Sequence, residues 1–210
     1  MIIPAITEKE FEEVRRKVGI VEKQTQSIHI DIADGILVNG ETFLDVSLLN
    51  TLATEISLEL HLMVKNPSDY LSELRNIKKV ITQVEGEDIM AFVTASKELG
   101  YKTGVSIAPS TSLETLNLFA TNVDFVQFMT IEPGAQRRPF QELVLEKIKT
   151  FKKNYPNMSI QVDGGINSET LKKVLEVGVN DIVVGSAIFD SEDPVQTLRQ
   201  LQKQVEEYKS

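Results

Sequence analysis

The chain has 210 residues, of which 41% are hydrophobic and 25% charged, a composition typical of a folded globular protein of one domain. It contains no cysteine, which excludes disulfides and thiolate chemistry and leaves only nitrogen and oxygen ligands for a metal. The net charge of -9 argues against binding to nucleic acid, because contacts to phosphate groups need clustered cations.

No apolar run approaches the roughly 20 residues that a membrane span requires. The first segment, Met1 to Glu13, turns acidic after a short apolar stretch, unlike a signal peptide. We therefore expect a cytoplasmic protein that has no membrane partner.

Short apolar segments rich in β-branched residues alternate with amphipathic segments along the whole chain. The predicted strands are Ile2–Ile6, Ser27–Ile32, Ser57–Val64, Val80–Glu85, Thr103–Ala108, Phe125–Ile131, Ser159–Val162 and Asp181–Val184. Helical patterns lie between or after them at Glu8–Lys17, Glu87–Leu99, Phe140–Lys153, Ser168–Val177 and Pro194–Tyr208, and Thr7–Glu10 fits a capping box for the first.

This alternation predicts a parallel α/β sheet. Eight units in one chain favour closure into a (β/α)8 TIM barrel that forms a single domain over residues 1–210. A doubly wound sheet is the alternative.

The two histidines of the chain lie near the carboxyl ends of the second and third predicted strands. His29 and Asp31 are two residues apart, so their side chains point to the same face. His61 lies on the third strand, and Asp163 follows the seventh. Strand carboxyl ends converge at one mouth of a barrel, so these four side chains form a candidate site for a divalent metal. Each residue alone is more often structural; their combination favours the metal site.

Glycines follow the last two predicted strands, at Gly164-Gly165 and at Gly185-Ser186. The free N–H groups and the dipole of a helix amino end attract anions. Loops after strands seven and eight are a frequent phosphate site in barrels. Glycine pairs also occur in ordinary turns, but their position here predicts that Gly164, Gly165, Gly185 and Ser186 bind phosphate.

The order and spacing of these motifs resemble the ribulose-phosphate 3-epimerase family from about Pro4 to Phe189. The matching segments are His29-Ile30-Asp31-Ile32-Ala33-Asp34-Gly35, Leu60-His61-Leu62-Met63-Val64, Gly104-Val105 with Pro109, Phe128-Met129-Thr130 through Pro133-Gly134, Val162-Asp163-Gly164-Gly165-Ile166 and Gly185-Ser186-Ala187-Ile188-Phe189.

The resemblance implies one divalent metal ion, which zinc, iron(II) or manganese would suit, bound by the four residues named above. It implies that Asp31 and Asp163 are also the catalytic acid and base. Gly134 matches the family's phosphate loop, and Met63 and Met129 match positions that line the substrate site. The alternative for both methionines is core packing.

The sequence departs from the family pattern around the substrate rather than around the metal. Glu8 replaces a serine and Gln83 a histidine, so both are candidate substrate contacts, although Glu8 also suits the first turn of a helix. A glycine-rich turn is replaced by Ala135-Gln136-Arg137-Arg138-Pro139. We hypothesise that Arg137 or Arg138 binds the phosphate through charge-assisted hydrogen bonds, the alternative being two solvated surface residues.

We therefore expect a metal-dependent isomerase of carbohydrate metabolism in the pentose phosphate pathway, converting D-ribulose 5-phosphate to D-xylulose 5-phosphate. The resemblance implies a small phosphosugar substrate and a homo-oligomer. Another ketose phosphate, such as D-allulose 6-phosphate, and a non-catalytic phosphosugar-binding relative stay open as alternatives. A hexulose-phosphate synthase or decarboxylase relative is less favoured, because His29-Ile30-Asp31 lacks the lysine of their Asp-x-Lys arrangement.

Overall fold

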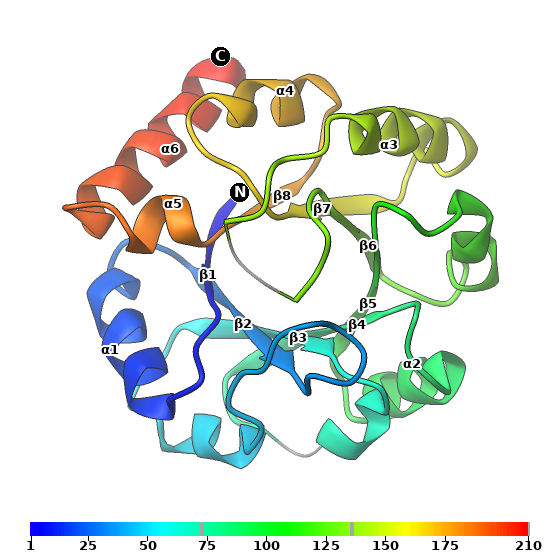
Figure 1. Ribbon diagram of the computed structural model, residues 1–210, viewed down its shortest axis with the longest axis horizontal. Helices are drawn as coiled ribbons and strands as arrows, with labels where there is room; N and C mark the ends of the chain where they lie inside the picture. Colours follow the sequence, from blue (N-terminus) through cyan, green and yellow to red (C-terminus); the bar gives the residue numbers. More distant parts are fainter. Residues whose placement is uncertain (72–73, 135–136, 210) are drawn as a thin grey trace.

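Eight parallel strands close into a barrel in the computed structural model, which describes residues 1–71, 74–134 and 137–209. Each strand pairs with the next along the chain, and β8 pairs with β1 (Figure 1). The strands are β1 (Ile2–Ile6), β2 (Ser27–Ala33), β3 (Ser57–Met63), β4 (Ile77–Gln83), β5 (Lys102–Ile107), β6 (Phe125–Met129), β7 (Ser159–Asp163) and β8 (Asp181–Val184). The predicted (β/α)8 barrel is confirmed, and the doubly wound alternative, an open sheet, is excluded.

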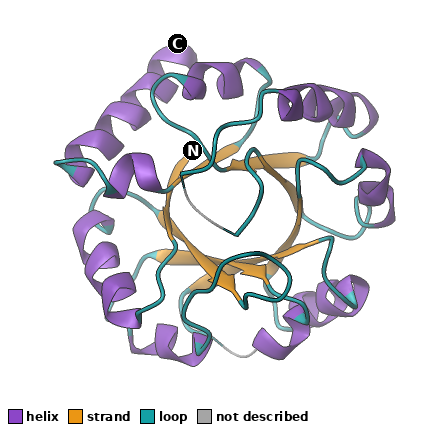
Figure 2. Ribbon diagram, viewed as in Figure 1, coloured by secondary structure: helices purple, strands orange, loops and turns teal. Residues whose placement is uncertain are grey.

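Helices surround the barrel on its outer side (Figure 2). They are α1 (Phe11–Val21), α2 (Ile89–Glu98), α3 (Leu143–Asn154), α4 (Thr170–Glu176), α5 (Ser186–Phe189) and α6 (Pro194–Lys209). The connections after β2, β3 and β5 carry the short 3-10 helices η1 (Val46–Thr51), η2 (Pro67–Tyr70) and η3 (Leu113–Leu118). The alternation of strands and helical segments therefore holds, with shorter helices in three connections.

The first helix begins later than predicted. α1 starts at Phe11, and Glu10 precedes it without a side-chain cap. The hydroxyl of Thr7 instead donates a hydrogen bond of 2.5 Å to Oδ2 of Asp31. The capping-box prediction is therefore wrong, because the hydroxyl that matched the motif is bonded to the end of the neighbouring strand.

The fourth strand begins earlier than predicted, at Ile77 rather than at Val80. Lys79 is a charged residue that points into the barrel, so it interrupts the apolar pattern from which the strand was predicted. Its ammonium lies 3.2 Å from Oε2 of Glu59 and 2.9 Å from Oδ2 of Asp181. Two carboxylates offset the cost of placing this charge inside a barrel.

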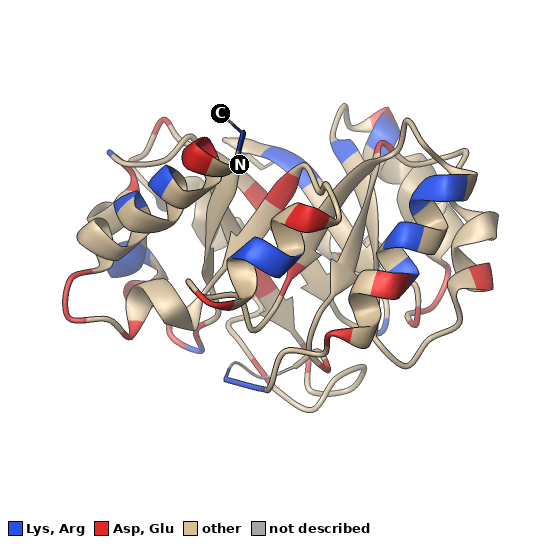
Figure 3. Ribbon diagram, turned by 90° about the horizontal axis from the view of Figure 1, so that it is seen from above, with Lys and Arg blue, Asp and Glu red and all other residues tan. Residues whose placement is uncertain are grey.

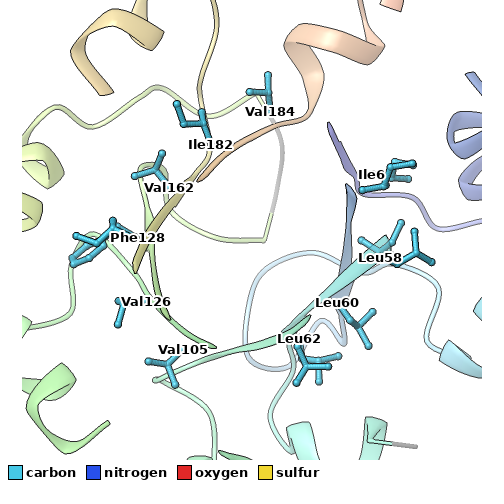
Figure 4. Close-up of a cluster of buried hydrophobic side chains, with 14 of the residues drawn as sticks. Ile6, Leu58, Leu60, Leu62, Val105, Val126, Phe128, Val162, Ile182 and Val184 are labelled. Carbon is cyan, nitrogen blue, oxygen red and sulfur yellow. The ribbon is translucent and has the colours of Figure 1, made fainter. Parts of the chain in front are cut away.

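Alternate residues of each strand face opposite sides of the barrel wall. Most outward side chains are apolar and pack against the helices, and Figure 4 shows Leu60, Leu62 and Phe128 among those that point away from the barrel axis. The inward positions include buried polar residues, such as Glu59 and Gln127. The main hydrophobic core therefore lies between barrel and helices, and the space inside the barrel is shared by buried polar groups and a small apolar cluster of Ile3, Ala5 and Val183.

Lysine, arginine, aspartate and glutamate are distributed over the outer helices (Figure 3). Within the three described stretches of the chain, every helix is too short or too polar to cross a bilayer.

Two glycines provide a matched test of this packing. A Cβ at Gly104 in β5 would lie 2.5 Å from the ring of Phe125, whereas a Cβ at Gly19 in α1 meets nothing within 4 Å. We expect Gly104→Ala to lower the free energy of unfolding by about 1–3 kcal/mol through overpacking. Gly19→Ala should raise it by about 0.5–1 kcal/mol, because alanine favours the helix. Urea denaturation measures both changes, and equal changes in the two variants would contradict the packing.

Candidate active site and metal centre

A cavity of about 650 Å³, including space open to solvent, lies at the carboxyl ends of the strands. This is the end of a barrel at which ligands bind. The cavity is lined by Ala5, Thr7, Asp31, Ala33, Glu41, Thr42, Met63, Met129, Ile131, Pro133, Gly134, Arg137, Asp163, Gly164, Gly165, Ile166, Gly185 and Ser186.

The four predicted metal ligands come together at the inner end of this cavity. Asp31 and Asp163 line it, and His29 and His61 are fully buried beside them. One potential ligand atom from each residue lies within 4.8 Å of the other three. Nε2 of His29 is 3.1 Å from Oδ1 of Asp31 and 3.8 Å from Oδ2 of Asp163. Nδ1 of His61 is 3.0 Å and 3.7 Å from the same two atoms.

The donor set of this cluster suits a divalent cation. Two imidazole nitrogens and two carboxylate oxygens are ligands that zinc, iron(II) and manganese accept. The second nitrogen of each ring is engaged elsewhere: Nδ1 of His29 is 2.6 Å from Oε1 of Glu59, and Nε2 of His61 is 3.2 Å from the side-chain amide of Gln83. The other two nitrogens, Nε2 of His29 and Nδ1 of His61, face Asp31 and Asp163, and Nδ1 of His61 also lies 3.3 Å from Nε2 of Gln127. The group could hold a metal ion.

The two cavity carboxylates differ in pKa. Burial alone would raise the pKa of Asp31, but His29 and His61 outweigh burial and hold it well below its usual range. Burial, reinforced by the negative charge of Asp31, raises the pKa of Asp163 to about 7. At neutral pH one carboxylate is therefore ionised while the other still carries a proton for much of the time, a difference suited to acid/base chemistry.

The pKa values of the two imidazoles are shifted in opposite directions. Burial lowers the pKa of His61. Burial also acts to lower the pKa of His29, but Asp31 and Glu59 overcome it and raise this pKa well above its usual value. Burial would raise the pKa of Glu59, whereas His29 and then Lys79 lower it, so this carboxyl is ionised. His29 thus lies between two carboxylates, whereas His61 lies between a carboxylate and an amide.

The residues predicted to bind phosphate all line the cavity: Gly134, Gly164, Gly165, Gly185 and Ser186. Gly164 has φ 111°, a conformation that side chains rarely adopt, and a Cβ there would lie 2.4 Å from the side chain of Ile131. Glycine is therefore required at this position for both backbone conformation and space. The backbone is thereby exposed to a ligand beside Asp163.

Met63, Met129 and Arg137 also line the cavity, as their predicted roles in substrate binding require. Met129 lies beside Asp163 in the register of β6 and β7. Nε of Arg137 donates a hydrogen bond of 2.8 Å to Oδ2 of Asp190, the residue that follows α5. Arg137 is therefore held at the cavity by a carboxylate.

Arg138 is turned toward its own loop. Its guanidinium donates to the carbonyl oxygens of Glu132 and Pro133 at 3.2 Å and 3.1 Å. Arg138 is not among the described residues that line the cavity. The neighbouring Ala135 and Gln136 lie outside the described residues.

The side chains of Glu8 and Gln83 contact other residues of the protein and do not line the cavity. Glu8 forms an ion pair with the ammonium of Lys17, and Gln83 contacts His61. Neither is among the described lining residues. Their roles in substrate binding stay predictions.

Three further polar residues contact the cluster and were missed by sequence reasoning. Thr7 donates to Asp31, Glu59 accepts from His29, and Nε2 of Gln127 lies 3.4 Å from Oδ2 of Asp163. A signal was present for two of them. Glu59 and Gln127 precede His61 and Met129 by two residues, which places each pair on one face of its strand.

Two curated proteins that are similar in sequence to this chain carry the same name. Ribulose-phosphate 3-epimerase, cytoplasmic isoform, from Oryza sativa subsp. japonica is 34% identical over 188 residues, covering 85% of this chain and 82% of that protein. Ribulose-phosphate 3-epimerase from Bacillus subtilis is 32% identical over 203 residues, covering 91% of this chain and 93% of that protein.

Solved structures share the fold at lower identity. The structure of KGPDC from Streptococcus mutans superposes with a TM-score of 0.77 at 13% identity, covering 100% of this chain and 98% of that one. That of 3-hexulose-6-phosphate synthase from Salmonella typhimurium gives a TM-score of 0.73 at 17% identity and 99% coverage of both chains. At such identities the likeness concerns the barrel alone.

The sequence profile of the family described as "Ribulose-phosphate 3 epimerase family" matches residues 1–189. The matched region contains all four residues of the cluster that could hold a metal ion and every predicted phosphate-binding residue. With the curated relatives in agreement, the chain belongs to the ribulose-phosphate 3-epimerase family of isomerases.

Proposed function

We propose that the protein is a metal-dependent ketose-phosphate 3-epimerase that interconverts D-ribulose 5-phosphate and D-xylulose 5-phosphate. One observation carries this proposal: two carboxylates, Asp31 from β2 and Asp163 from β7, reach one cavity and, with His29 and His61, form a cluster that could hold a cation. The names of the rice and Bacillus subtilis relatives support the choice of substrate.

Inverting a carbon next to a ketone requires removal of its proton from one face and addition of a proton to the other. Asp31 comes from β2 and Asp163 from β7, strands that are separated in the barrel by β1 and β8. In one direction the ionised Asp31 accepts the C3 proton, which leaves an enediolate, and Asp163 then donates its proton to the opposite face of C3. In the reverse direction the two carboxyl groups exchange roles, so each turnover conserves protons.

His29, Asp31, His61 and Asp163 would hold the cation, which supplies Lewis-acid stabilisation of negative charge on the substrate oxygens. Thr7 fixes the orientation of Asp31 through the bond to Oδ2, while Oδ1 of that carboxylate faces the two histidines. Met63 and Met129 add polarisable, apolar surface to the cavity, which limits the access of water to the reacting carbon.

The phosphate group would lie against Gly134, Gly164, Gly165, Gly185 and Ser186. Arg137 would supply the positive charge, since it lines the cavity and its fork of N–H donors matches a phosphate. In the absence of substrate, Asp190 provides this arginine with an anionic partner.

We also propose that the protein is cytoplasmic, forms a homo-oligomer and acts in the pentose phosphate pathway. Family membership supports all three, and the rice relative is named a cytoplasmic isoform.

The two-carboxylate scheme is tested by isotope exchange. During turnover in heavy water, solvent deuterium should enter the substrate at C3. Asp31→Asn and Asp163→Asn should each lower kcat by about 10²–10⁴-fold, because each removes one proton-transfer group. NMR of the sugar follows the exchange, and Asp69→Asn, an exposed aspartate in η2, is the control. Wild-type exchange rates in Asp163→Asn would reject the scheme.

The metal requirement is tested by chelation. We expect the purified protein to lose its epimerase activity when stripped by a strong chelator and to recover it with zinc, iron(II) or manganese. Elemental analysis should find one ion per chain in the wild type and much less in His61→Asn, because one of four ligands is lost. Full activity in protein shown to be free of metal would contradict the proposed role.

The role of Arg137 is tested by comparing substrates. Arg137→Ala should raise the KM for D-ribulose 5-phosphate several-fold, because the phosphate would lose a charge-assisted hydrogen-bond donor. It should leave kcat/KM for unphosphorylated D-ribulose unchanged. Arg75→Ala, just before β4 and away from the cavity, is the control. An unchanged KM for the phosphorylated sugar would show that Arg137 is only a surface residue.

A further inference from the structure

A buried chain of charges runs through the barrel behind the metal-binding cluster. Glu59 lies in the middle of β3 and is completely buried. Its Oε1 is 2.6 Å from Nδ1 of His29 and also accepts a hydrogen bond of 2.5 Å from Nε2 of Gln161. Its Oε2 faces the ammonium of Lys79 at 3.2 Å, and the same ammonium is 2.9 Å from Asp181. Glu59 is therefore held from two sides and aimed at one histidine.

The strand register explains why these groups meet. Glu59 lies opposite His29 on β2 and opposite Lys79 on β4. Residues level with each other on neighbouring strands point to the same side of the sheet, so all three side chains project into the barrel. A buried carboxylate costs several kcal/mol unless it is paired. Its placement between a cation and an imidazole therefore indicates a built contact rather than a chance one.

The contact determines which nitrogen of His29 carries a proton. An ionised carboxylate only accepts hydrogen bonds, so Nδ1 of His29 is the protonated nitrogen of the neutral ring. When the ring is neutral, as it must be to bind a cation, Nε2 therefore presents its lone pair toward Asp31 and Asp163. In His61 the other nitrogen, Nδ1, faces these carboxylates, and the distal partner is the neutral amide of Gln83. The two histidines are thus supported by partners of different charge.

We infer that Glu59, held by Lys79, is a positioning residue that fixes the tautomer of His29, increases its strength as a ligand and so sets the cation affinity of the cluster. This inference rests on the proposed function in one respect, that His29 binds the cation. Carboxylates that accept from the distal nitrogen of a ligating histidine hold the ring and make it more basic. Glu59 does not line the cavity among the described residues, so it acts through His29 and not on the substrate.

The test measures cation binding to the whole protein without any turnover. The metal-free protein is titrated with zinc in competition with a chromophoric chelator, and with cobalt(II), whose absorption reports the ligand field. Glu59→Gln keeps the volume of the side chain and removes its charge. We expect it to weaken zinc binding by about 10- to 100-fold, the usual effect of losing such a partner.

A second variant covers the case in which Glu59→Gln fails to fold because Lys79 is left unpaired. The double variant Glu59→Leu/Lys79→Met replaces the buried pair with apolar side chains, an exchange that proteins often tolerate. It should also weaken zinc binding. In ¹⁵N NMR of the metal-free protein, recorded at a pH high enough to deprotonate His29, the neutral wild-type ring should show a single Nδ1–H tautomer, and this double variant should show a mixture.

Lys102→Met is the matched control, because Lys102 contacts the ring of Phe125 as Lys79 does, at 5.9 Å and 5.3 Å from the ring centre, but is exposed. It should leave zinc affinity and tautomer unchanged. Wild-type zinc affinity and a single His29 tautomer in a folded Glu59 variant would overturn the inference and leave the epimerase proposal intact. A wild-type protein that binds no cation at the cluster would instead overturn the metal-dependent function and this inference together.

Discussion

Charges buried inside the barrel must neutralise one another, and the arrangement of the site depends on this. Asp181, Lys79, Glu59 and His29 follow one another with each neighbouring pair in contact. An isolated ion at this depth would cost several kcal/mol. The chain of opposite charges avoids that cost and ends at the imidazole that faces the cavity carboxylates. The cavity end of the barrel is thus oriented by Asp181, Lys79 and Glu59, which are not among the described residues that line the cavity.

These charges can be buried inside the barrel because the main hydrophobic core lies outside it. The outward faces of the strands and the apolar faces of the helices supply the main core, so the stability of the fold comes largely from outside the barrel wall. The inward face therefore contributes less to the packing that stabilises the fold, and it can hold polar side chains. Polar residues such as Gln161 and Ser106 are buried there without disrupting the packing of the helices.

The outward residues are also why so much was predictable from the sequence. Leu58, Leu60 and Leu62 mark β3 as a strand, and the two-residue period then assigns His61 to the opposite, inward face. The same rule places His29 with Asp31. Barrel closure brings β2, β3 and β7 to one mouth, so the four-residue cluster follows from strand order and from the alternation of side chains. The glycines that line the cavity follow from the same convergence.

The features that sequence reasoning missed depend on which of several possible partners a polar side chain contacts in the folded protein. A local sequence pattern carries no information about such distant partners. The hydroxyl of Thr7 matched a helix cap, yet in the fold a carboxylate from β2 is nearer. Lys79 carries a charge that normally marks a surface position, and only its two acidic partners on β3 and β8 make the inward position tolerable. Arg137 and Arg138 are adjacent in sequence, but one meets Asp190 and the other its own loop. Such preferences arise only after distant segments have been brought together.

Gly104 shows how an absent side chain shapes the interior. It lies beside Phe125 in the register of β5 and β6, and any Cβ there would collide with the aromatic ring. The missing methyl group leaves room for this ring, and the ammonium of Lys79 lies 5.3 Å from its centre. An apolar ring beside these ions lowers the local dielectric constant, so their mutual attraction is stronger there than it would be in water. The electrostatic balance of the barrel interior thus depends on the smallest residue in its wall.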